Sequence, residues 1–154
     1  MLKRILFVLI SLLLVAQFFR PELVNPPFEP ANDMLVRTNA PADIQALVKS
    51  TCYDCHSHHT NYPWYTAITP VNYWMKDHIE EGREHLNFSL WDRYATGKHT
   101  HEAGEEVAEG EMPPGYYTLV HGEARLSDGD RAKLVAWLNA NLGSEGEREE
   151  RGKH

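Results

Sequence analysis

The stretch Thr51-Cys52-Tyr53-Asp54-Cys55-His56-Ser57 guides the interpretation of the whole chain, because it holds the only two cysteines among 154 residues. Cys-x-x-Cys-His is the pattern to which a c-type haem is attached. Residues at i, i+3 and i+4 share one face of a helical turn, so Cys52, Cys55 and His56 are predicted to point the same way. Two thioether bonds to one porphyrin edge would then place the imidazole of His56 beneath the iron.

Three other interpretations of the motif compete with haem attachment. A structural zinc site needs four ligands, and histidines would have to complete it because no second cysteine pair is present. A thiol–disulfide redox motif usually sits in a βαβ setting, and no strand-like alternation surrounds these residues. The third interpretation is a plain disulfide or a chance pattern. We favour covalent haem, which also requires a distant second axial ligand and an export signal.

Residues 1–20 have the pattern of an export signal. Lys3 and Arg4 precede an apolar run over residues 5–19, and Arg20 ends it. The run suits a signal-peptide core and is a little short for an ordinary membrane span. No small-x-small cleavage site follows, so we expect an uncleaved signal anchor, with a cleaved signal as the alternative. Positive charge at the amino terminus predicts a single-pass protein of the inner (cytoplasmic) membrane whose soluble part faces the periplasm.

Composition divides the remaining chain into three parts. Residues 21–38 begin with a proline-rich stretch and are expected to form an extended tether, with an arm packed along the domain as the alternative. Residues 39–143 are expected to form the haem-binding domain. Residues 144–154 are charged and lack apolar anchors, so a disordered tail is expected.

Apolar residues at helical spacing predict an all-α fold. The first helix of the domain carries its stripe at Ile44, Leu47 and Val48 and runs directly into Cys52. The last helix starts at Ser127, which resembles the first residue of a capping box. No strand alternation and no internal repeat is found. Other helical segments are predicted from Thr69, Ser89 and Thr100, and a loop is predicted from Tyr116 to Arg125.

Met112 is the predicted second axial ligand of the haem iron. It lies between Gly-Glu and Pro-Pro at a predicted helix break, where a thioether can project from a loop. Soft thioether sulfur suits haem iron, and Met/His ligation raises the reduction potential. Five histidines remain as alternatives to Met112, namely His78, His85, His99, His101 and His121.

The surroundings of the haem are predicted with less detail. The ring N–H of His56 needs an acceptor, and the carbonyl of Pro63 is our expectation. Five aromatic residues either line the haem edge or simply pack in the core: Tyr62, Trp64, Trp74, Tyr116 and Tyr117.

Charge and ligand set together indicate an electron carrier. The net charge of −7 and the lack of a basic patch argue against a nucleic-acid partner. With both axial positions closed, no small-molecule substrate is expected, and the chain is predicted to be no enzyme. We expect it to exchange single electrons with a redox partner protein at the membrane. The alternative function is a haem-based sensor or ligand-binding protein with one labile axial position.

Residues 40–142 resemble a family of small membrane-anchored bacterial haem-binding domain proteins that carry the pattern of monohaem cytochromes c. The resemblance implies covalent haem c, with His56 as one ligand and Met112 as the other. It also implies a cytochrome c-like fold in which the Ile44 stripe packs across the last helix, on Leu134, Val135 and Leu138. The matching stretches are Cys52–Ser57, Tyr62–Tyr65, Glu81–Arg83, Leu86–Ser89, Gly110–Pro113 and His121–Ser127.

Overall fold

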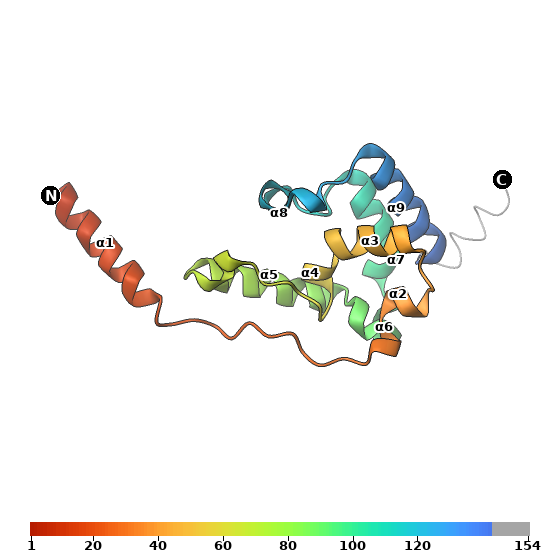
Figure 1. The fold of residues 1–154 in the computed structure, drawn as a ribbon, viewed down its shortest axis with the longest axis horizontal. Coiled ribbons are helices and arrows are strands. Elements are labelled where there is room, and N and C mark those ends of the chain that lie inside the picture. The colour runs from red at the N-terminus through yellow and green to blue at the C-terminus, as the bar shows by residue number, and fades with distance from the viewer. Residues whose placement is uncertain (143–154) are drawn as a thin grey trace.

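The protein, seen as a computed structural model that describes residues 1–142, consists of helices and connecting loops (Figure 1). No strand occurs within this range, which confirms the all-α prediction. The predicted tail, residues 144–154, lies outside the described residues. The α-helices are α1 Leu2–Ala16, α2 Met34–Arg37, α3 Ala42–Thr51, α4 Tyr53–His56, α5 Val71–His85, α6 Trp91–Tyr94, α7 Lys98–Glu109, α8 Gly115–Val120 and α9 Asp128–Asn141.

Short 3-10 turns complete the fold: η1 Pro30–Asn32, η2 Trp64–Ala67, η3 Phe88–Leu90 and η4 Gly122–Ala124. The segment predicted as a loop from Tyr116 to Arg125 therefore contains α8 and η4. The start of α9 agrees with the sequence prediction, because the hydroxyl of Ser127 accepts the N–H of Asp130 at 3.1 Å.

The core brings α3 and α9 together. Val48 on α3 and Leu134 on α9 are completely buried, and Ile44 and Leu138 belong to the same cluster. Helix α7 packs closely on α9 at Gly104, where an added Cβ would collide with the side chain of Asn139. The stripe on the first domain helix thus meets the last helix, as the resemblance implied.

Helix α1 corrects the prediction of a membrane anchor. It has 15 residues, none of them buried. At about 1.5 Å per residue it extends roughly 22 Å, short of a hydrocarbon core of about 30 Å. The side-chain amide of Gln17, at the end of the helix, donates to the carbonyl of Thr69 at 2.9 Å and accepts the N–H of Thr69 at 3.0 Å. No helix within residues 1–142 has the length and apolarity to cross a membrane, so the predicted single-pass placement in the inner membrane is wrong.

The chain between α1 and η1 lies along the helical body (Figure 1). The amide of Asn25 donates to the carbonyl of Thr60 at 2.9 Å, and the hydroxyl of Tyr62 donates to the carbonyl of Val24 at 3.1 Å. The Phe28 ring lies edge-on against the ring of His59, 4.5 Å between centroids. The segment is therefore the packed arm that the sequence analysis gave as the alternative to an extended tether.

Candidate haem-binding site

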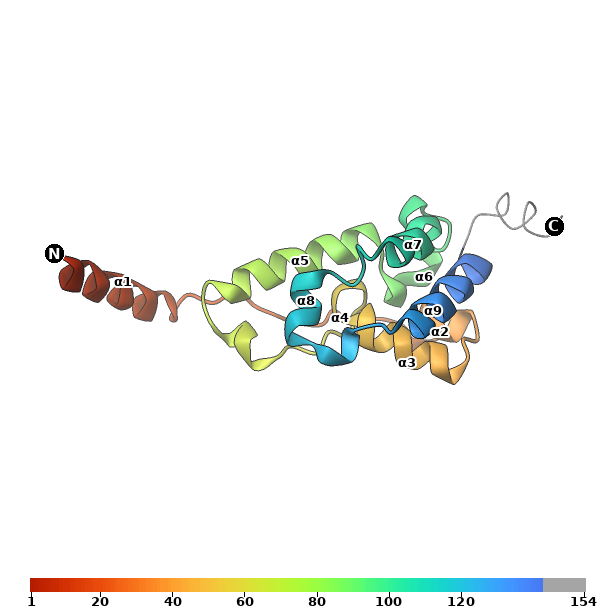
Figure 2. The same ribbon diagram turned by 90° about the horizontal axis from the view of Figure 1, so that it is seen from above.

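A cavity of about 610 Å³ lies beside α4 and has a predominantly apolar lining. Seen from above, α5 and α8 lie on one side of α4, and α7 and α9 lie beyond it (Figure 2). The size falls within the range of sites for cofactors and other small molecules, about 300–1,000 Å³. The four predicted site residues all contribute to its wall: Cys52, Cys55, His56 and Met112.

The side chains of Cys52, Cys55 and His56 line the cavity, and the two intervening residues are each hydrogen-bonded to a different neighbour. The backbone of Cys52 interrupts the helix, so α3 ends before it and α4 restarts after it. The hydroxyl of Tyr53 donates to the buried carboxylate of Asp33 at 2.6 Å. Asp54 also contributes to the cavity wall, and its carboxylate accepts the hydroxyl of Tyr117 at 2.7 Å.

The imidazole ring of His56 is oriented by two backbone carbonyls. Its Nδ1–H points at the carbonyl oxygens of Gly82 at 2.9 Å and Leu86 at 3.0 Å. Within the described residues Nε2 has no hydrogen-bond partner, so its lone pair is available. Burial lowers the pKa of His56, which favours the neutral imidazole that a metal needs. The prediction that the carbonyl of Pro63 accepts the ring N–H of His56 is wrong, because that carbonyl instead accepts the N–H and the hydroxyl of Thr66.

Gly82 permits the close approach of α5 to the motif. A Cβ at this position would lie 2.8 Å from the carbonyl oxygen of Cys55, a backbone atom that cannot turn aside. Glycine in a helix interior is otherwise unfavourable, by about 1 kcal/mol relative to alanine. A glycine in the middle of a well-formed helix was therefore the sequence signal for this contact.

The two thiols are free and protonated. Burial raises the pKa of Cys52 to about 11 and that of Cys55 to about 11. Thiol–disulfide exchange uses the thiolate, which such surroundings disfavour. Among residues 1–142, no group of three or more histidine, cysteine or acidic side chains is arranged to hold a metal ion. The zinc interpretation therefore finds no ligand set in this part of the chain.

Met112 reaches the cavity by way of a tight turn after α7. Gly110 adopts a left-handed conformation with φ of 84° and ends the helix, as glycine does at this position. The N–H of Met112 then donates to the carbonyl of Glu106 at 3.1 Å, which directs the chain back. The side chain lines the cavity and is 36% exposed.

The structure separates the alternative histidines into two groups. The ring of His121 is fully engaged, with Nε2 2.6 Å from the hydroxyl of Tyr65 and Nδ1 3.0 Å from the carboxylate of Glu123. His101 donates to the carbonyl of Leu142 at 2.7 Å. Neither of these two lines the cavity. The histidines that do line it, besides His56, are His78, His85 and His99.

His78 resembles His56 in its hydrogen bonding. Its Nδ1 lies 3.1 Å from the carbonyl of Trp74, so Nε2 is again the free nitrogen. His85 and His99 instead face each other, with ring nitrogens 3.3 Å apart. Of the five predicted aromatic residues, the structure places three in the cavity wall, Trp74, Tyr116 and Tyr117, and two outside it, Tyr62 and Trp64.

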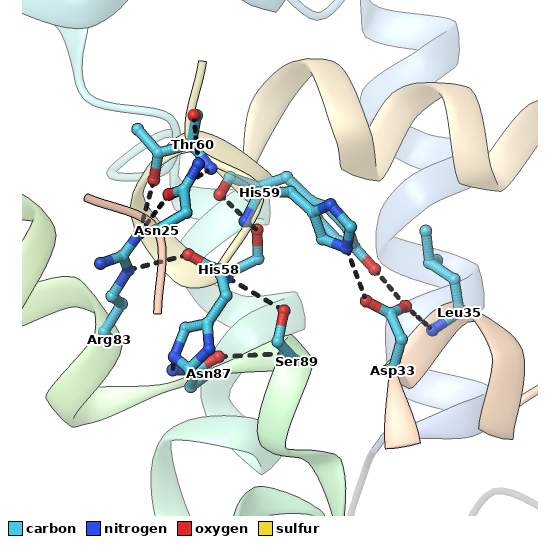
Figure 3. Close-up of polar contacts among 11 residues, drawn as sticks. Asn25, Asp33, Leu35, His58, His59, Thr60, Arg83, Asn87 and Ser89 are labelled. Carbon is cyan, nitrogen blue, oxygen red and sulfur yellow. Dashed lines mark hydrogen bonds and ion pairs between the residues drawn. The ribbon is translucent and has the colours of Figure 1, made fainter. Parts of the chain in front are cut away.

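A polar network fixes the loop that follows the motif (Figure 3). The guanidinium of Arg83 donates to the carbonyl of Ser57 at 2.8 Å and to the side chains of Asn25 and Thr60, each at 2.9 Å. The N–H of His58, the next residue along the loop, donates to the hydroxyl of a serine on η3 at 2.9 Å. The arm, α5 and η3 therefore all hold the chain where it leaves His56.

The buried carboxylate of Asp33 supports the motif from behind (Figure 3). One oxygen accepts the N–H of Leu35 at 3.0 Å and the hydroxyl of Tyr53, and the other lies 3.7 Å from the ring of His59. Burial first, and then the bond to Asp33, raise the pKa of Tyr53, so its hydroxyl remains a donor. Sequence reasoning missed this residue, which falls in the predicted tether.

Two thiols and a neutral imidazole that share the wall of a cofactor-sized cavity define a haem-binding protein. Comparison with family models supports this class. The model of the haem-binding domain family matches residues 11–140, and the chain belongs to that family. Neither a curated protein nor a solved structure matched the chain.

Proposed function

We propose that the protein is a monohaem c-type cytochrome that carries single electrons. The observation that supports this most directly is the joint placement of Cys52, Cys55, His56 and Met112 in the wall of one apolar cavity. Family membership supports haem as the cofactor. The covalent bonds, the sixth ligand and the electron-transfer role are our proposal.

The chain's own groups account for attachment and orientation. The thiols of Cys52 and Cys55 would each add across one vinyl group of the haem, with sulfur bonding one carbon and the hydrogen going to the other, so that no oxidant would be needed. Held by these residues, a haem would supply one-electron chemistry. The carbonyls of Gly82 and Leu86 hold the ring of His56 and increase the basicity of Nε2.

Met112 completes the ligand set in this proposal. If His56 and Met112 both held the iron, it would have no position open to a substrate, and the protein would act as a carrier rather than an enzyme. The partial exposure of Met112 favours one second candidate, a sensor or ligand-binding protein in which this position opens. Carbon monoxide separates the two, because rapid stoichiometric binding to the reduced protein at neutral pH would support the sensor.

Mass spectrometry of denatured protein tests covalent attachment. The protein is produced in cells that have the cytochrome c maturation machinery, then unfolded in acid. We expect the mass of the chain plus one haem, because thioether bonds survive denaturation. The mass of the bare chain would reject the c-type proposal while leaving reversible haem binding open.

Met112→Leu is expected to abolish the weak long-wavelength absorption band that arises from sulfur-to-iron charge transfer, and to lower the reduction potential. Leucine conserves volume but offers no donor atom. The matched control is Met75→Leu, because Met75 also lines the cavity but lies on the buried face of α5. If the wild type lacks this band and Met112→Leu leaves the optical spectrum unchanged, then one of His78, His85 and His99 is the ligand instead.

A further inference from the structure

A row of three hydrogen-bonded side chains connects the cavity wall with solvent. Tyr65 contributes to the wall, and its hydroxyl lies 2.6 Å from Nε2 of His121. His121 itself does not line the cavity, and its Nδ1 lies 3.0 Å from the carboxylate of Glu123. The side chain of His121 is 13% exposed, whereas that of Glu123 is 65% exposed. We call these three side chains the relay.

The direction of both hydrogen bonds follows from the charge of Glu123. Bonds from its own backbone N–H and from His121 lower the pKa of Glu123, so near neutral pH it is a carboxylate and can only accept. In a neutral His121, Nδ1 must then carry the hydrogen, and Nε2 accepts the hydroxyl hydrogen of Tyr65. Burial, and then the charge of Asp54, raise the pKa of Tyr65, which keeps that hydroxyl protonated. Nε2 is therefore the position at which the relay can take up a proton.

The groups packed around His121 favour a positive charge on its ring. Tyr117 of α8 is stacked on the ring, with 4.2 Å between centroids, and the Tyr117 hydroxyl is bonded to the carboxylate of Asp54 on α4. Glu123 provides a second carboxylate, from η4. The cation that follows η4, Arg125, is bonded to backbone carbonyls of α8. An imidazolium at this place can donate to Tyr65 through Nε2 and to Glu123 through Nδ1.

We propose that Tyr65, His121 and Glu123 form a proton relay that couples electron uptake by this protein to the uptake of one proton. The inference rests on the proposed function, because it requires a redox-active haem in the cavity that Tyr65 lines. One electron reaches the protein from an external one-electron donor, and one proton from solvent forms an N–H bond at Nε2 of His121. Tyr65 changes from donor to acceptor, and no other bond is made or broken. The electron and the proton favour each other equally, because coupling between two sites is reciprocal.

Potentiometry of the haem-loaded full chain between about pH 5 and 8 tests the coupling. We expect His121 to bind its proton about three- to tenfold more tightly in the reduced protein, since the added electron attracts the positive ring. The reduction potential should then fall by about 28–59 mV as pH rises through the titration of His121, because 59 mV corresponds to a tenfold change for one electron. A reversible potential that does not change with pH would overturn the relay alone. Absence of any reversible one-electron reduction would overturn the proposed function as well.

Replacement of His121 assigns the pH dependence to the relay. His121→Gln should abolish the fall in potential, because an amide can still bond Tyr65 but binds no proton in this pH range. The matched control is His101→Gln, because His101 also lies outside the cavity wall and its ring bonds the carbonyl of Leu142 at 2.7 Å. This control should retain the fall. Equal pH dependence of the potential in the two variants would overturn the inference.

Nitrogen-15 NMR of the histidine rings in the reduced full chain provides a readout that does not depend on electron transfer. Above the titration of His121 its ring hydrogen should lie on Nδ1, and a hydrogen on Nε2 would overturn the relay. Glu123→Gln alters an exposed side chain, so the fold should be retained. Loss of the carboxylate should weaken proton binding by His121 about two- to fivefold and move its titration to lower pH. An unchanged titration would contradict the place of Glu123 in the relay.

Discussion

Replacing Cys52 and Cys55 together with alanine is expected to remove all haem that survives denaturation. Both thiols line the cavity and are the only cysteines of the chain, so no other side chain can form a thioether. His56 and Met112 remain, and haem should still bind reversibly while the protein is folded. Mass spectrometry and haem staining after denaturing electrophoresis provide the measurement.

The single variants and a neighbouring control make the result specific. Cys52→Ala and Cys55→Ala should each retain one covalent bond, and therefore the mass of one haem. Ser50→Ala should retain both bonds, because the hydroxyl of Ser50 bonds only the carbonyl of Leu47 in its own helix, at 3.0 Å. Covalent haem in the double variant would falsify the assignment of the attachment residues.

Gly82→Ala is expected to destabilise the protein and to raise its reduction potential. The new Cβ would lie 2.8 Å from the carbonyl oxygen of Cys55, so α5 must move away from α4. That movement weakens the bonds from His56 to Gly82 and Leu86, and a less basic imidazole stabilises the ferric state less. We expect unfolding free energy to fall by about 1–3 kcal/mol, against the gain of about 1 kcal/mol that alanine brings to a helix.

Two further glycines provide the controls for this prediction. Gly122→Ala meets no atom within 4 Å and should leave stability and potential unchanged. Gly104→Ala collides with the Asn139 side chain between α7 and α9, and should lower stability while leaving the potential near that of the wild type. Denaturant titration measures the free energy of unfolding, and potentiometry measures the reduction potential. If the reduction potential changes in step with the free energy of unfolding in all three variants, then Gly82 has no specific role in setting the potential through His56.

Local patterns were enough to predict the larger helices. The stripe of Ile44, Leu47 and Val48 marks α3, and the Ser127 cap marks the start of α9. Helix α8 was not predicted, because its six residues are too few to establish a period and none of them is buried. Helix α2 was missed because Asp33, which caps it, follows a proline-rich stretch.

The attachment residues were visible in the sequence, but their support was not. The spacing of Cys52, Cys55 and His56 follows from one helical turn, whereas backbone carbonyls 26 and 30 residues further on have no sequence signature. The membrane prediction failed for a similar reason. It relied on the apolar run over residues 5–19, whereas α1 ends at Ala16 and has 15 residues.

The two residues between the cysteines are more than a spacer. Tyr53 is hydrogen-bonded to Asp33 and Asp54 is hydrogen-bonded to Tyr117, so the two side chains have different partners. A designer who transplants only the pentapeptide Cys52–His56 into another helical bundle would leave both side chains without their anchors. The recipient bundle therefore also needs a counterpart of Asp33 and of Tyr117 if the transplanted cysteines are to keep their orientation.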